Sequence, residues 1–160
     1  MSLPHNPKGT LVSSINDFET VIRINLTGTF IVCKLAARAM VDRSLGGCII
    51  NISSVQAMSG GRSPQYSASK AGIHGLSKSL ARELAPYNIR VIVLAPGGTD
   101  TEFGQRYWSK EVRKKLEEAT LLGRLAKPEE IANILLFLAS DSASYITGTV
   151  IHANGGFRLD

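Results

Sequence analysis

Apolar residues recur along the first part of the chain at the spacing of a helix. Residues 13–43 carry this pattern, and Ser14 or Asn16 can cap its start. The stretch Asn25–Thr29 (NLTGT) weakens the pattern, because it holds β-branched residues and a glycine. Two glycines at positions 46–47 end the element. The pattern therefore predicts one long helix with an irregular centre.

Three short apolar runs, rich in β-branched residues, have the length and composition of buried parallel strands. They are Cys48–Ser53, Ile89–Ala95 and Thr149–Ala153. Helical patterns separate them, from Tyr66 to about Ala85, over Ser109–Ala119, and from Pro128 to about Ser140, while residues 54–65 read as a loop. This alternation predicts a parallel sheet with right-handed crossovers. In such a sheet the ligand lies beyond the carboxyl ends of the strands.

Composition narrows the class of protein. The chain has 160 residues, of which 44% are hydrophobic and 19% charged, so it can bury a core and is not expected to be disordered.

Residues 1–12 read as a leader or loop. No apolar run approaches the length of a membrane span, and no signal-peptide pattern opens the chain. We therefore expect a cytoplasmic protein with no membrane partner.

The cysteines and histidines show no pattern typical of a metal site. Cys33 and Cys48 lie in apolar surroundings and form no C-x-x-C pair, which favours buried, reduced thiols. His5, His74 and His152 are scattered without the spacing of ligands. We expect no bound metal.

The net charge of +5 is concentrated between Arg106 and Lys127. A basic patch of this kind could meet nucleic acid, an anionic cofactor or an acyl carrier. The simpler interpretation is a solvated helix face, and no nucleic-acid motif accompanies the charge. We therefore expect no nucleic-acid partner.

The sequence YSASK places a phenol and an ammonium group four residues apart. At this spacing Tyr66 and Lys70 share one face of a helix. A free phenol releases its proton only near pH 10, and a nearby ammonium stabilises the phenolate. Ser54 follows a predicted strand and could donate a hydrogen bond to an oxygen on which negative charge develops. Taken singly, each of these residues could equally be structural.

Together with NISSV, YSASKAG, VLAPGGTDT and the C-terminal run from GRLAKPEE to HANGG, these residues resemble the short-chain dehydrogenase/reductase family. The 3-oxoacyl-carrier-protein reductase-like group is the most similar. The resemblance implies an α/β fold with a partial Rossmann-like, doubly wound parallel sheet. About three strands with flanking helices would form its C-terminal half. Residues 13–160 would then be the catalytic and oligomerisation part of a single domain.

The same resemblance implies an NAD(P)-dependent oxidoreductase that acts on a carbonyl or alcohol substrate. Tyr66 would be the general acid or base, and Ser54, preferred to its neighbour Ser53, would stabilise the carbonyl oxygen. Lys70 would bind the nicotinamide ribose and tune the phenol, while Asn25 would hold a water in the proton relay. Pro96, Gly97, Thr99 and Thr101 would lie beside the nicotinamide, together with Tyr66 and Lys70. Members of the family assemble through their helices, so a homo-oligomer, a dimer or tetramer, is expected.

The glycine-rich turn T-G-x-x-x-G-x-G, with which the family binds the cofactor pyrophosphate, does not occur in these 160 residues. Neither do the residue that selects NAD or NADP and the N-N-A-G segment, so the choice of cofactor stays open. The alternative function is a truncated, redox-inactive fragment that acts through its oligomer interface. A stripe of small residues, Ala68, Gly72, Gly75 and Ser79, and an exposed edge of the strand Cys48–Ser53 would supply that interface.

We expect this chain by itself to bind NADH and NADPH weakly, to catalyse no turnover and to self-associate. Each hydrogen bond to a charged phosphate is worth about 1.5–3 kcal/mol, so the loss of two or three weakens binding by several orders of magnitude. Calorimetry with both cofactors, with light scattering on the same sample, measures the two outcomes. A micromolar dissociation constant from a monomer would contradict the expectation.

Overall fold

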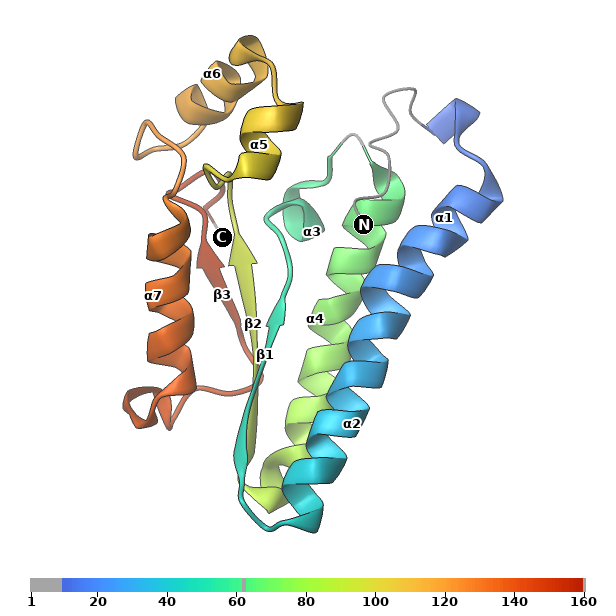
Figure 1. Cartoon of the computed structure of the whole chain (residues 1–160), viewed down its shortest axis with the longest axis vertical. Helices are drawn as coiled ribbons and strands as arrows, with labels where there is room; N and C mark the ends of the chain where they lie inside the picture. The colour runs from blue at the N-terminus through green and yellow to red at the C-terminus, as the bar shows by residue number, and fades with distance from the viewer. Residues whose placement is uncertain (1–9, 62, 160) are drawn as a thin grey trace.

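A three-stranded parallel sheet with helices on both faces forms the centre of the molecule (Figure 1). The computed structural model describes residues 10–61 and 63–159. The strands are β1 (Gly47–Ile52), β2 (Ile89–Pro96) and β3 (Val150–Ala153), in the order β1-β2-β3. Each lies within one residue of its predicted bounds. The predicted α/β class and partial parallel sheet are thereby confirmed.

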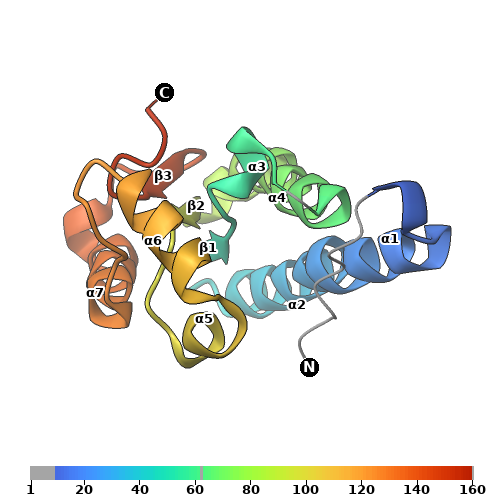
Figure 2. The same ribbon diagram turned by 90° about the horizontal axis from the view of Figure 1, so that it is seen from above.

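The helices form two layers around the sheet. Figure 2 shows α2 and α4 on one side and α7 on the other, with α5 and α6 toward the viewer. The helical elements are η1 (Thr10–Val12), α1 (Ile15–Ile22), η2 (Arg23–Thr27), α2 (Gly28–Asp42), α3 (Gln56–Ser59), α4 (Pro64–Leu84), η3 (Ala85–Tyr87), α5 (Glu102–Tyr107), α6 (Lys110–Glu118), α7 (Pro128–Ala139) and η4 (Asp141–Ala143).

The first long helix is continuous from α1 through η2 to α2. Ser14 caps it, because its hydroxyl accepts from the Asp17 amide at 3.0 Å while the Asp17 carboxylate accepts from the Ser14 amide. The irregular centre predicted from NLTGT is a π-helical turn, in which the Gly28 amide reaches back to the Arg23 carbonyl. Such turns occur as short insertions in α-helices, frequently at functional sites.

Other predictions need correction. The segment expected to be a loop, 54–65, contains the short helix α3 and the start of α4. Helix α5 was not predicted. Of the expected leader, residues 1–9 lie outside the described residues and Thr10–Val12 forms a 3-10 turn. Both cysteines are free thiols, but only Cys33 is buried, while Cys48 is half-buried.

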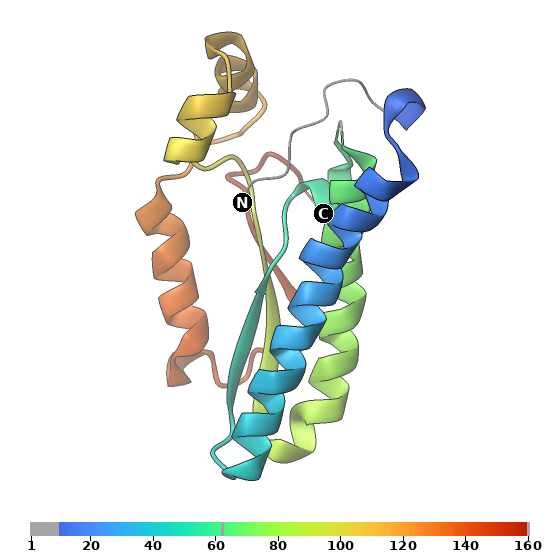
Figure 3. The same cartoon turned by 45° about the vertical axis from the view of Figure 1, so that its right-hand side comes forward.

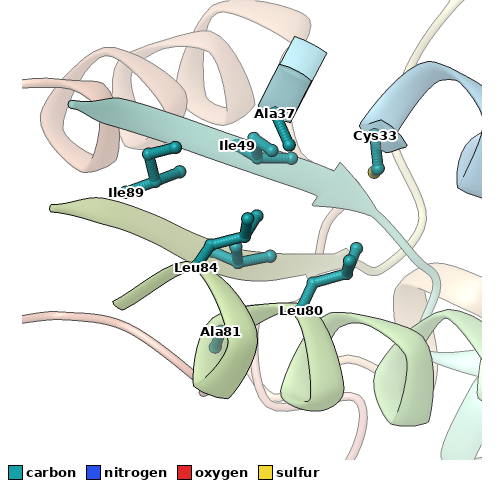
Figure 4. Packing of buried hydrophobic residues seen from close by; sticks show 8 residues of the cluster. Cys33, Ala37, Ile49, Leu80, Ala81, Leu84 and Ile89 are labelled. Carbon is teal, nitrogen blue, oxygen red and sulfur yellow. The ribbon is translucent and has the colours of Figure 1, made fainter. Parts of the chain in front are cut away.

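Side chains that alternate along the strands build one core on each face of the sheet. Toward α2 and α4 the buried cluster contains Cys33, Ala37, Ile49, Leu80, Ala81, Leu84, Ile89 and Val91 (Figure 4). Toward α7 it contains Ile92, Leu94 and Leu138, with Cys48, Ile50 and Ile134 packed against them. Because successive residues of a strand point to opposite faces, β2 contributes to both cores. This double burial explains why its sequence is almost wholly apolar.

Apolar side chains also remain on the surface of the long helix and at the end of β1. Val32, Leu35 and Leu45 are each more than 60% exposed. By length and composition alone, the helix Ile15–Asp42 is able to cross a membrane, since an 18-residue window within it has a mean hydropathy of 1.3. The expectation that no apolar run approaches such a length was therefore wrong, because this helix is apolar over much of its circumference. The absence of a membrane partner stays a prediction.

Two glycines of α4 differ in their surroundings. Helix α4 lies alongside the first long helix (Figure 3). A Cβ atom at Gly72 would come within 2.7 Å of the Leu26 side chain, whereas a Cβ atom at Gly75 would meet nothing within 4 Å. Part of the predicted small-residue stripe therefore packs inside this chain, and part of it is open.

Gly75→Ala should raise the free energy of unfolding by about 0.5–1 kcal/mol, because alanine is the better helix former and the site is open. Gly72→Ala should raise the free energy of unfolding by less, or even lower it, since the Leu26 side chain must move to make room for the added methyl group. Urea unfolding of the two variants provides a matched comparison. Equal gains at the two positions would show that the contact between Gly72 and Leu26 does not constrain the helix pair.

Candidate functional site

The carboxyl ends of the three strands are joined by backbone hydrogen bonds that continue beyond the sheet. The Ser53 amide donates to the Leu94 carbonyl at 2.7 Å, and the Val55 amide donates to the Pro96 carbonyl at 2.9 Å. On the other side, the Gly97 amide donates to the Ala153 carbonyl at 2.9 Å. These bonds hold the loops after β1, β2 and β3 together, as predicted for a parallel sheet.

The first turns of α4 bring Tyr66 and Lys70 to this end of the sheet. Pro64 occupies the first turn of the helix, where its missing N–H costs nothing. The Lys70 amine donates to the Ile52 carbonyl at 2.9 Å and lies 5.7 Å from the centroid of the Tyr66 ring. Both residues are half-buried. Burial lowers the pKa of the Lys70 amine.

The two neighbouring serines have different surroundings. Ser53 is buried, and its hydroxyl donates to the Lys70 carbonyl at 3.0 Å and lies 2.7 Å from Nε2 of His74. Ser54 is half-buried, and its Oγ accepts from the Gln56 amide at 3.2 Å. Because Ser54 uses a lone pair in that bond, its proton remains available to another acceptor. This difference favours Ser54 as the serine that faces a substrate.

Asn25 reaches the same turn of α4 from the π-helical turn. Its side-chain amide donates to the Ser69 hydroxyl at 3.1 Å, and that hydroxyl donates to the Tyr66 carbonyl at 2.7 Å. The Asn25 main-chain carbonyl accepts from the Thr29 hydroxyl at 2.7 Å. The structure therefore brings Asn25, Ser54, Tyr66 and Lys70 to one end of the molecule. Ser69 was missed as a linking residue, although it directly precedes Lys70 in the sequence.

The residues predicted to lie beside a nicotinamide form the loop after β2. Pro96 ends the strand, and a Cβ atom at Gly97 would lie only 2.8 Å from Cα of Asn154 in the loop after β3. The Thr99 hydroxyl donates to the Gly97 carbonyl at 3.3 Å. The Thr101 hydroxyl caps α5 by accepting from the Gly104 amide at 3.2 Å. Of these two threonines, Thr101 keeps a proton to donate.

Ion pairs attach α6 and α7 to the loops of the site. Asp100 and Arg113 form a two-point pair at 2.8 Å, which lowers the pKa of the Asp100 carboxyl. Arg124 pairs in the same way with Glu130 at 2.7 Å and lowers the pKa of that carboxyl to about 2. Three of the cations between residues 106 and 127 are therefore paired with acids, since Lys114 also lies 3.7 Å from the Glu118 carboxylate, and the face is not purely solvated. These pairings were not predicted from the sequence.

Within residues 10–61 and 63–159, no three His, Cys, Asp or Glu side chains lie close enough together to hold a metal ion.

Residues 4–158 match the sequence model of a family described as Enoyl-(Acyl carrier protein) reductase. The chain is 48% identical over 144 residues to 3-oxoacyl-[acyl-carrier-protein] reductase FabG of Aquifex aeolicus, covering 89% of this chain and 57% of that protein. It is 42% identical over 147 residues to human (3R)-3-hydroxyacyl-CoA dehydrogenase, covering 91% of this chain and 56% of that protein. The chain thus spans somewhat more than half the length of these relatives.

Solved structures agree with the sequence comparison. A short-chain type dehydrogenase/reductase from Mycobacterium marinum superposes with a TM-score of 0.87 at 35% identity, over 97% of this chain and 61% of that one. A 4-hydroxyisoleucine dehydrogenase complexed with NADH superposes with a TM-score of 0.89 at 32% identity, over 94% of this chain and 63% of that one.

The Lys70 amine should titrate below the ordinary lysine value of about 10.4, because burial disfavours its charged form. Since the unfolded chain then binds this proton more tightly than the folded one, Lys70 makes the free energy of unfolding rise with pH between the two values. Acylation of the amine at a series of pH values, read by mass spectrometry of the peptide containing Lys70, gives the midpoint. A midpoint at or above the ordinary value would contradict the burial effect. Lys70→Met should remove its share of the pH dependence of unfolding.

Proposed function

This chain belongs to the short-chain dehydrogenase/reductase family, and we propose that it carries the proton-transfer site of an NAD(P)-dependent oxidoreductase acting on a carbonyl or alcohol. The observation that carries the proposal is the arrangement of Tyr66, Lys70 and Ser54. The amine of Lys70 is held by the Ile52 carbonyl near the Tyr66 ring, and Ser54 follows the same strand.

In the direction of carbonyl reduction, Tyr66 gives its phenolic proton to the carbonyl oxygen as the C=O bond becomes an alcohol. Ser54 donates a hydrogen bond to the same oxygen while negative charge develops there. The Lys70 ammonium stabilises the negative charge left on the phenol. In alcohol oxidation the same groups act in reverse, and Tyr66 accepts the proton. Asn25, which is linked to the Tyr66 main-chain carbonyl through Ser69, would hold a water that returns protons to this site.

The residues present suit the nicotinamide end of a dinucleotide. Lys70 would bind the ribose, and the loop from Pro96 to Thr101 would lie beside the ring. The close approach at Gly97 leaves no room for a side chain there, and Thr101 has a proton to donate. A bound nicotinamide would supply or accept the hydride at the carbonyl carbon. NAD and NADP remain equal candidates, because none of the described residues is identified as the one that distinguishes the two cofactors at the adenosine phosphate.

A 3-oxoacyl or 3-hydroxyacyl thioester is the first substrate class to test. Two relatives, from Aquifex aeolicus and from human, are named for such acyl groups. Helix α6, which carries Lys110, Lys114 and Lys115, lies beyond the carboxyl ends of the strands (Figure 1). Cations in this place would favour an anionic carrier of the acyl group.

A second candidate function is assembly without redox activity, favoured by the apolar surface of the long helix. Ile31, Val32 and Leu35 are each at least half exposed, and Gly75 of α4 faces open space. Exposed apolar faces of this extent mark sites of association. We propose that a further copy of this protein, in a dimer or tetramer, covers part of this surface in either case.

In a full-length protein that contains this chain, Tyr66→Phe should lower kcat/KM for a 3-oxoacyl thioester by about 10²–10⁴-fold, because it removes the proton donor and keeps the ring. Acetoacetyl coenzyme A with NADH or NADPH, followed by nicotinamide absorbance, is the assay. Tyr87→Phe is the matched control, since Tyr87 is 51% exposed and lies at the far end of α4.

A Tyr66→Phe variant with activity within about threefold of the parent protein would refute the assignment of Tyr66. If that full-length protein reduces no carbonyl substrate with either cofactor, yet this chain self-associates, the assembly function replaces the oxidoreductase function.

A further inference from the structure

Two buried polar side chains meet beside Lys70 and have no part in the chemistry described above. Ser53, directly after β1, is 3% exposed, and His74 of α4 is 9% exposed. The Oγ of Ser53 lies 2.7 Å from Nε2 of His74, and the two residues are 21 positions apart in sequence. Burying polar groups is costly unless they bond to each other, so a hydroxyl and an imidazole at this place need an explanation.

The two hydrogen bonds of the Ser53 hydroxyl, to the Lys70 carbonyl and to His74, indicate which atom donates in each. The Lys70 carbonyl can only accept, so the single proton of the Ser53 hydroxyl is directed to it, at 3.0 Å. In the tautomer with its proton on Nε2, His74 then donates to Ser53. Burial, with the nearby His152 and Lys78, lowers the pKa of His74, so the imidazole is neutral at pH 7 and adds no charge beside the Lys70 ammonium.

Two adjacent residues at the end of β1 therefore hold both ends of Lys70. The carbonyl of Ile52 accepts from the Lys70 amine at 2.9 Å, and the hydroxyl of Ser53 donates to the Lys70 carbonyl. His74 supports the second of these contacts. Tyr66, Lys70 and His74 follow one another at intervals of four, so they form a single row along one face of α4. A slip of α4 along β1 would break both contacts at once.

We propose that His74 is a positioning residue, which acts through the buried hydroxyl of Ser53 to hold α4 in register with the end of β1 and so to fix the Lys70 amine at the Ile52 carbonyl. The consequence for rate depends on the proposed function. The consequence for the placement of Lys70 does not, and it is measurable without turnover.

Three single variants and one double variant separate positioning from simple core packing. His74→Leu fills a similar space without a donor, whereas His74→Gln retains a side-chain N–H that can donate. Ser53→Ala removes only the hydroxyl. In the double variant Ser53→Ala/His74→Leu both polar partners are replaced, so neither is left buried and unpaired. Its stability should therefore recover relative to the single variants.

The readout is the pH midpoint for acylation of Lys70 in the intact chain, with urea unfolding on the same samples. In His74→Leu, Ser53→Ala and the double variant, a released Lys70 amine becomes more hydrated. Its midpoint should then rise by about half a pH unit or more. His74→Gln should stay near the parent value. If His74→Leu does not fold, Ser53→Ala and the double variant give the same comparison.

A double variant that recovers stability while its Lys70 midpoint stays at the parent value would overturn the proposal, because the pair would then serve packing alone. So would a shift in His74→Gln as large as that in His74→Leu. If the protein is active, the displaced Lys70 should lower kcat about tenfold in the double variant and alter its pH profile. If the full-length protein reduces no carbonyl at all, the proposed function fails, and the Lys70 midpoint still decides the role of His74.

Discussion

The contact between the end of β1 and the first turns of α4 is the constraint on which the candidate site depends. Lys70 spans it twice, through its amine to the Ile52 carbonyl and through its own carbonyl to the Ser53 hydroxyl. A lysine amine on a long side chain is normally free to sample many rotamers, at a cost in entropy when it is fixed. Here the Ile52 carbonyl at the end of β1 sets the position of the amine, which makes the location of positive charge near Tyr66 a property of the fold.

Much of the remaining structure keeps that contact in register. The apolar cluster beneath α4 packs Leu80 and Leu84 onto the sheet farther along the helix. A buried polar chain runs from Cys33 of α2 through Asn51 of β1 to Ser77 of α4, with distances of 3.2 and 2.9 Å. Apolar packing is not directional, whereas these hydrogen bonds are, so the polar chain specifies which turn of each helix meets the strand.

The same arrangement explains why the site and the remaining surface differ so much in character. At the carboxyl ends of the strands, nearly every loop is tied to a neighbour by backbone bonds or by the ion pairs of Asp100 and Glu130. Along the first long helix, by contrast, apolar side chains remain uncovered. A rigid end that carries polar groups suits chemistry, and an apolar flank suits association. Both properties are consistent with the family to which the chain belongs.

The sequence by itself determined the strands, the long helices and the pairing of Tyr66 with Lys70, because each follows from residues close together in the chain. The recurrence of apolar residues every two positions in a strand, or nearly every four in a helix, is a local property of the sequence. A tyrosine and a lysine four residues apart likewise share a helix face wherever that helix lies. The short helices α3 and α5 were not predicted, because helices of so few residues are too short to show a periodic pattern of apolar residues. Only the tertiary structure decided that Ser53 turns inward while Ser54 does not. It also decided that His74 lies behind Lys70 and that Arg113 reaches Asp100. Those contacts join residues that are distant in sequence, and only the packing of helices, strands and loops against one another brings them within hydrogen-bonding distance.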